Sequence, residues 1–195
     1  MEVLAILVIA AVYAWHDCML PAVVPLFLVA TVSRYARGKS WDDAVRGSPY
    51  MGPAALAGLV ALGLALLAGT PLVELTGRDV EWSQYPIVRG SAHQLFAVAV
   101  LVAVGAVAGE LALRAWIVER ALELGAARWG AVAIGALAEG VLWPGDLAAR
   151  LGAAVMGAGL GVLYVAAGRR AGASIAARVL FALGALALEG LKVVS

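Results

Sequence analysis

The sequence predicts an all-α protein, a polytopic transmembrane helix bundle of about six helices that forms one domain over residues 1–195. Hydrophobic residues make up 64% of the chain and the mean hydropathy is +0.95, which is more apolar surface than a soluble core of this size can enclose. Apolar runs of roughly 20 residues, the length that crosses a bilayer, recur between polar breaks. No strand-type alternation of apolar and polar residues competes with these runs.

The apolar runs define the expected helices in chain order. They are Val3–Val32, Pro53–Leu72, Ala92–Leu122, Trp129–Trp143, Leu147–Gly168 and Ala173–Val194. A straight helix over the first run would be about 45 Å long, against about 30 Å of hydrocarbon. This run also contains His16, Asp17, Pro21 and Pro25, and proline breaks or kinks helices. The segment is therefore either one kinked crossing or a hairpin of two short helices.

Basic residues are distributed unequally between the two sides of the expected bundle. If the first run crosses once, one side holds Arg34, Arg37, Lys39, Arg46, Arg120, Arg128, Arg169 and Arg170, and the other holds only Arg78, Arg89 and Arg150. Because cytoplasmic loops collect lysine and arginine, the richer side is expected in the cytoplasm and both termini outside. If the first run is a hairpin, only the N-terminus changes sides, and the distribution of basic residues stays the same. We expect an integral protein of a prokaryotic plasma membrane, and the absence of asparagine is typical of a thermophilic source.

Composition excludes several classes of function. The formal net charge is only +1, so a nucleic-acid groove is not expected. Cys18 is the single cysteine, and His16 and His93 are the two histidines, which excludes an internal disulfide and a Cys/His-rich zinc site. We expect no cofactor and no metal.

Four charged residues in the apolar runs matter most, because a charge near the bilayer centre costs about 2.5 to 3.5 kcal/mol and needs a partner or a function. Glu110 and Arg114 are four residues apart and can neutralise each other on one helix face. Glu139 has no basic residue within a turn, and Arg178 is alone in its run and cannot lose its proton. The sequence therefore predicts an ion pair between Glu139 and Arg178 across helices. Such pairs either fix the helix register or mark a functional site.

Small and aromatic residues predict local packing. Gly105 with Gly109, and Gly157 with Gly161, have the four-residue spacing that lets helix backbones approach closely. Four tryptophans near helix ends are typical of interfacial anchors. They are Trp15, Trp116, Trp129 and Trp143.

Three segments resemble the CPBP family, which comprises the type II CAAX prenyl proteases and bacteriocin-processing relatives. The segment Gly109–Arg120, GELALRAWIVER, resembles the family's E-E-x-x-x-R motif, and residues 131–146 lie without gaps on its F-x-x-x-H motif. Residues 157–183 resemble the small-residue helix, tight turn and final helix that carry its third motif, H-x-x-x-N/D. The resemblance covers about residues 91–190 and implies a CAAX-protease-like fold.

The departures from the family fall on its catalytic positions. Gly109 stands where the family has the glutamate that activates water, and glycine offers no general base. Glu139 stands at the phenylalanine and Trp143 at the histidine of the second motif. Arg178 or Ala177 stands at the third-motif histidine, and Ala182 or Phe181 at its terminal Asn/Asp. Glu110 and Arg114 match the family's second glutamate and arginine.

Three functions follow as hypotheses. The first is a non-catalytic CPBP-like protein, a pseudoprotease, which binds a hydrophobic peptide, a lipid or a partner membrane protein, with Arg114, Arg178 and Trp143 in structural or binding roles. The second is an active intramembrane endopeptidase that uses Glu110 and Glu139 as a two-carboxylate site. The third is a small carrier or complex subunit in which buried charges line a polar path.

Overall fold

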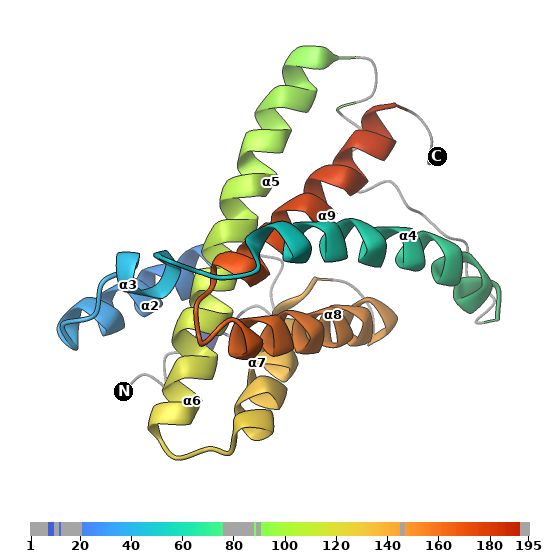
Figure 1. The fold of residues 1–195 in the computed structure, drawn as a ribbon. Helices are drawn as coiled ribbons and strands as arrows, with labels where there is room; N and C mark the ends of the chain where they lie inside the picture. Colours follow the sequence, from blue (N-terminus) through green and yellow to red (C-terminus); the bar gives the residue numbers. More distant parts are fainter. Residues whose placement is uncertain are drawn as a thin grey trace.

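In the computed structural model of the chain, every described secondary-structure element is a helix and no described residue is in a strand. The structure describes residues 8, 9, 12, 21–75, 88, 91–144 and 147–191. The elements are α2 (Val23–Ala36), α3 (Asp42–Val45), α4 (Met51–Leu75), α5 (Ala92–Ala112), the π-helix η2 (Leu113–Val118), α6 (Glu119–Glu123), α7 (Arg128–Leu142), α8 (Leu147–Ala166) and α9 (Gly172–Gly190). The all-α prediction is confirmed, and Figure 1 shows the arrangement.

Three of the described helices are long and apolar enough to cross a bilayer. They are Ala92–Glu123, Leu147–Ala166 and Gly172–Gly190. Two further helices, Val23–Ala36 and Met51–Leu67, are apolar but shorter over their described residues. α7 has 15 residues, which span about 22 Å and fall short of the hydrocarbon thickness. The structure therefore indicates a membrane protein with three candidate spans, where the sequence predicted about six helices of that kind.

In the second half of the first apolar run, the helix begins later than the sequence predicted. Pro21 and Ala22 are not helical, and α2 begins at Val23 with Pro25 in its first turn, where the missing N–H is tolerated. α2 then continues to Ala36, beyond the expected end at Val32. His16 and Asp17, and with them the choice between one crossing and a hairpin, lie outside the described residues.

Helix pairs pack through glycine at several positions. A Cβ added to Gly157 on α8 would lie 2.7 Å from a carboxylate oxygen of Glu139, and one added to Gly161 would lie 2.9 Å from Val132. The predicted close approach at this pair of glycines is therefore confirmed, since both face α7. At Gly105 no described atom lies within 4 Å of an added Cβ, so the described helices do not approach each other closely there.

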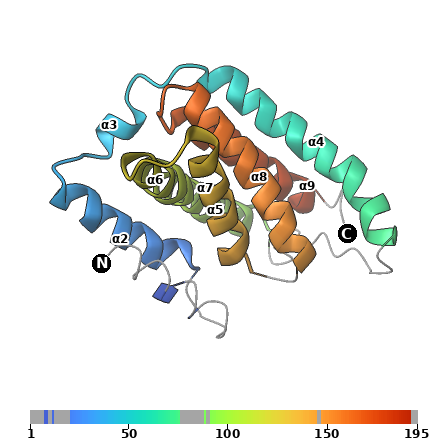
Figure 2. The ribbon, with the colours of Figure 1, turned by 90° about the horizontal axis from the view of Figure 1, so that it is seen from below.

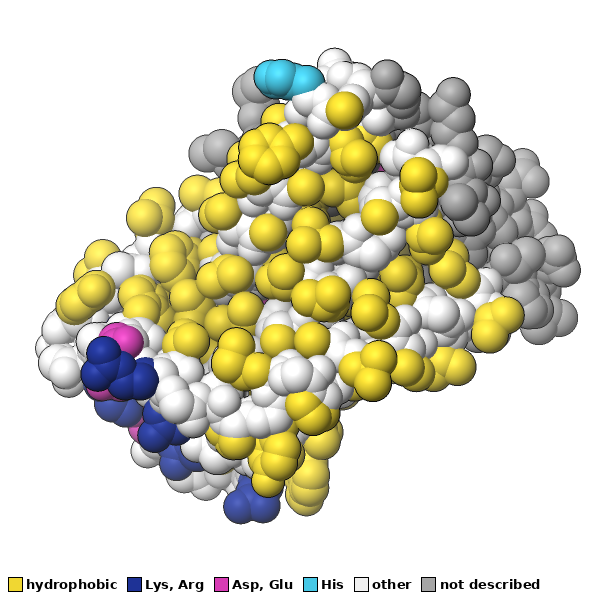
Figure 3. Space-filling model, turned by 45° about the horizontal axis from the view of Figure 1, so that its top comes forward, with side chains coloured by type: hydrophobic (Ala, Val, Ile, Leu, Met, Phe, Trp, Pro, Cys, Tyr) yellow, Lys and Arg dark blue, Asp and Glu magenta, His cyan; other side chains and the backbone are white. Residues whose placement is uncertain are grey.

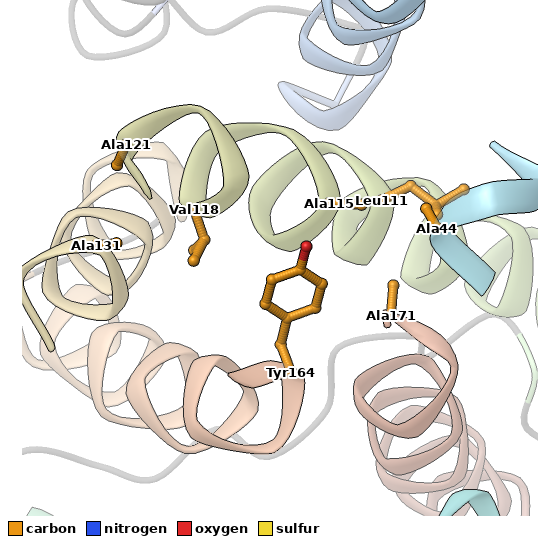
Figure 4. Packing of buried hydrophobic residues seen from close by; sticks show 8 residues of the cluster. All are labelled: Ala44, Leu111, Ala115, Val118, Ala121, Ala131, Tyr164 and Ala171. Carbon is orange, nitrogen blue, oxygen red and sulfur yellow. The ribbon is translucent and has the colours of Figure 1, made fainter. Parts of the chain in front are cut away.

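Figure 2 shows α4, α9 and α8 as neighbouring helices, with α2 on the opposite side of α5. Between these groups, a buried cluster surrounds Tyr164 of α8, whose ring points toward η2 and α6 (Figure 4). Its residues come from six elements and the turn before α9. They are Ala44, Leu111, Ala115, Val118, Ala121, Ala131, Tyr164 and Ala171.

On the face shown in Figure 3, charged side chains gather at one end and hydrophobic side chains cover much of the rest. At the charged end, Arg37, Lys39 and Arg120 all pair with Glu123. Arg169 pairs with Glu119, and Arg170 donates to the backbone carbonyl of Arg46. The basic residues that the sequence assigned to one side of the bundle thus lie at one end of the structure.

Candidate functional site

The four charges predicted at membrane depth converge in one buried cluster. Arg114 of η2 and Arg178 of α9 each form an ion pair with Glu139 of α7, through different carboxylate oxygens. Arg178 Nη1 also lies 3.5 Å from Glu110 Oε1. Arg114 Nε lies 3.6 Å from Glu110 Oε2. The cluster therefore joins α5, η2, α7 and α9.

The cluster is enclosed by protein. The side chains of Glu110 and Arg114 are 0% exposed and that of Glu139 is 2% exposed, whereas Arg178 is 13% exposed and forms the edge of the cluster. Two carboxylates and two guanidinium groups give a net charge of zero when all four are ionised. This balance is what makes the burial tolerable, because one unpaired charge at this depth costs several kcal/mol.

The predicted ion pair between Glu139 and Arg178 is present, and Glu110 and Arg114 are in contact as predicted. The expectation of two separate pairs is wrong, because Arg114 and Arg178 both hydrogen-bond Glu139. Spacing along the chain identifies partners on the same helix only. It does not show that a second helix brings another carboxylate closer to Arg114.

Trp143 lies against the exposed edge of the cluster. The guanidinium carbon of Arg178 is 5.6 Å from the centre of the Trp143 ring, within the range of a cation–π contact. Trp143 is thus a cluster residue as well as a helix-end tryptophan.

Trp129 is 63% exposed, as an anchor would be. Trp116 is 1% exposed and donates to Ser33 Oγ at 2.8 Å, so the anchor prediction is wrong there, and Trp15 lies outside the described residues.

Glu110 is the least satisfied member of the cluster. Among the described residues, none donates a hydrogen bond to either of its carboxylate oxygens, and Arg114 Nε has no acceptor. The Arg114 guanidinium instead donates to the carbonyl of Gly135 and to Glu139. Glu110 is held by charge alone, while Glu139 is held by charge and hydrogen bonds. The two carboxylates therefore differ in how they are held, although both contact Arg178.

The π-helix η2 sets the position of Arg114. In an α-helix the Glu119 N–H would bond the carbonyl of Ala115, but here it bonds the carbonyls of Arg114 and Trp116. The Ala115 carbonyl accepts from Arg34 Nη1 at 2.6 Å. Single π-helical turns inside α-helices are frequent at functional sites, and this one begins at Leu113, three residues after Glu110.

Arg34, Tyr164 and Glu189 are the largest of the buried polar side chains that were not singled out in the sequence. Arg34 is 4% exposed, bonds the carbonyls of Ala115 and Ser40, and stacks on Trp41 with 4.7 Å to the ring centre. Tyr164 donates to Glu119 Oε2 at 3.0 Å. Glu189 near the end of α9 is 2% exposed. The position of Glu189 within the last apolar run was the one sequence signal that could have identified it.

Within the described residues, no group of three or more His, Cys, Asp or Glu side chains could hold a metal ion. Comparison of the chain with protein-family models, curated proteins and solved structures found no match.

Proposed function

We propose that this chain is a non-catalytic membrane protein related to the CPBP type, which binds a hydrophobic peptide, a lipid or a partner membrane protein among its helices. One observation carries the proposal. Both carboxylates of the buried cluster face arginines, and Glu139 is hydrogen-bonded by two of them. A carboxylate so engaged is a poor general base, since proton abstraction from water would break a charge-balanced network.

The spatial arrangement of the motif segments supports the CPBP part of the proposal. The positions matched to the three family motifs are far apart in the sequence, yet Glu110, Arg114, Glu139 and Arg178 lie in mutual contact. Trp143, at the second-motif histidine position, contacts Arg178. Positions that converge in this way are what a shared site would require. In this chain they form a charge-neutral, enclosed cluster.

An active endopeptidase is the second candidate, and one observation favours it. Both carboxylates contact the same Arg178 nitrogen, so they lie well within the roughly 10 Å over which two carboxylates can share a water. Glu110, whose oxygens accept no hydrogen bond from the described residues, would then be the base. Gly109 still offers no second acid at the preceding position.

The two candidates are separated by a cleavage assay. Purified protein in liposomes would be incubated with a membrane-bound reporter peptide, beside the Glu110→Gln and Glu139→Gln variants. The proposal expects the same background signal from all three proteins. Cleavage by the wild-type chain that disappears in Glu110→Gln would replace the proposal with the endopeptidase. Circular dichroism of each variant checks that the helices are retained.

A further inference from the structure

A cavity of about 260 Å³ lies at the charged end of the molecule, away from the buried cluster. It is lined by Leu122 of α6, Arg128 at the start of α7, Val165 of α8, and Gly168 and Arg169 in the turn between α8 and α9. Arg128 is about 16 Å from Glu139 along α7 at 1.5 Å per residue. The cavity is therefore a separate place in the fold, with its own chemistry.

The two arginines of this cavity are held differently. Arg169 donates through Nε to Glu119 Oε2 at 2.9 Å and pairs through Nη2 with Glu119 Oε1, which raises the pKa of Arg169. This pairing fixes the guanidinium and leaves its third nitrogen, Nη1, outside the contact. Arg128 is exposed, and no carboxylate in the described part of the chain contacts it. One guanidinium is thus preorganised at the cavity wall and the other is available.

The surroundings of the cavity match the surface of a membrane. Trp129 and Leu124, which adjoin its residues in sequence, are 63% and 66% exposed. Tryptophan and arginine at helix ends are typical of the headgroup level of a bilayer. Leu122 and Val165 supply apolar walls beside the two cations. A ligand that fits would carry a negative group next to an apolar part.

We propose that this cavity binds the phosphate group of an anionic phospholipid. Arg128 and Arg169 contact the phosphate oxygens, for which the planar donor fork of arginine is well matched. Leu122 and Val165 contact the glycerol and the first methylene groups. A free phosphate ester carries the same anionic group but gains nothing from the apolar walls. The site does not depend on the function proposed for the four-charge cluster, so either proposal can fail alone.

The test compares one arginine inside the cavity with one outside it. Arg128→Gln removes the available guanidinium. Arg46→Gln is the matched control, because Arg46 belongs to the same basic side but pairs with Asp42 and does not line the cavity. Binding of phosphatidylglycerol, phosphatidylcholine and glycerol phosphate to detergent-purified protein is measured by native mass spectrometry and by thermal stabilisation.

We expect phosphatidylglycerol to bind more tightly than the other two probes. Arg128→Gln should weaken its binding at least about tenfold, the loss expected for one hydrogen bond to a charged group. Arg46→Gln should leave binding within about twofold. Equal weakening by both variants would overturn the site in favour of diffuse surface attraction. Equal binding of glycerol phosphate would replace the lipid with a free phosphate ester, and equal binding of phosphatidylcholine would remove the requirement for net negative charge.

Discussion

Arg178 on α9 forms a buried ion pair with Glu139 on α7, and the same Arg178 nitrogen faces Glu110 on α5. Removing either member of the pair leaves the cluster with one uncompensated charge. Removing both leaves Glu110 and Arg114, which are neutral together. The losses of unfolding free energy caused by substitutions at Glu139 and at Arg178 should therefore not be additive.

We expect Glu139→Gln and Arg178→Met each to lower the free energy of unfolding by about 3 to 5 kcal/mol, the usual cost of breaking a buried pair. The double variant should be destabilised by clearly less than the sum of the two. Unfolding in detergent, followed by circular dichroism, measures all three. The exposed pair of Asp42 and Arg46 provides the control cycle, with a coupling of about 0 to 1 kcal/mol. Additive losses at Glu139 and Arg178 would contradict the pairing.

Gly157 provides a second prediction, because its missing side chain makes room for Glu139. The substitution Gly157→Ala would place a Cβ 2.7 Å from the Glu139 carboxylate and 3.2 Å from the Ala136 backbone. The added methyl group should destabilise the protein by about 1 to 3 kcal/mol, as overpacking does. Gly159→Ala on the same helix is the control, since no described atom lies within 4 Å of its added Cβ, and alanine favours a helix. Equal melting temperatures for the two variants would argue against close packing of α7 on α8.

The sequence was sufficient for the all-α class and for one cross-helix contact, but it predicted about six membrane-spanning helices where the described residues contain three candidates. A long apolar run predicts a helix directly, because the whole run must be shielded from water, either by other helices or by lipid. Glu139 and Arg178 could be matched because each lacked a partner on its own helix. The π-helix at Arg114 could not be foreseen, since no residue type encodes it. Within it, the Ala115 carbonyl accepts a hydrogen bond from Arg34, which is 81 residues away in the sequence. The burial of Trp116 could not be foreseen for a similar reason, because Trp116 donates a hydrogen bond to Ser33, which is also far away in the sequence.

Arg34 therefore supplies a third prediction. Its guanidinium bonds the carbonyls of Ala115 and Ser40 and stacks on Trp41. Lysine has a single compact ammonium group and cannot make all three contacts. Arg34→Lys should cost about 1 to 3 kcal/mol of unfolding free energy, through buried carbonyls that lose their donor. Arg37→Lys, in the more exposed network at Glu123, should cost less than about 1 kcal/mol. The reverse order of the two losses would mean that Arg34 does not support η2.

The orientation of the chain is the last prediction. The α6–α7 turn lies at the basic end, and His93, the second residue of α5, lies at the other end of the same long helix. Because basic segments stay in the cytoplasm, Leu124 should face the cytoplasm and His93 the outside. In a Cys18→Ser background, Leu124→Cys and His93→Cys would be treated with a membrane-impermeant maleimide on intact cells. We expect immediate labelling of His93→Cys, and labelling of Leu124→Cys only after permeabilisation. The opposite pattern would reverse the orientation, and labelling of both from outside would show that Ala92–Glu123 does not cross the membrane.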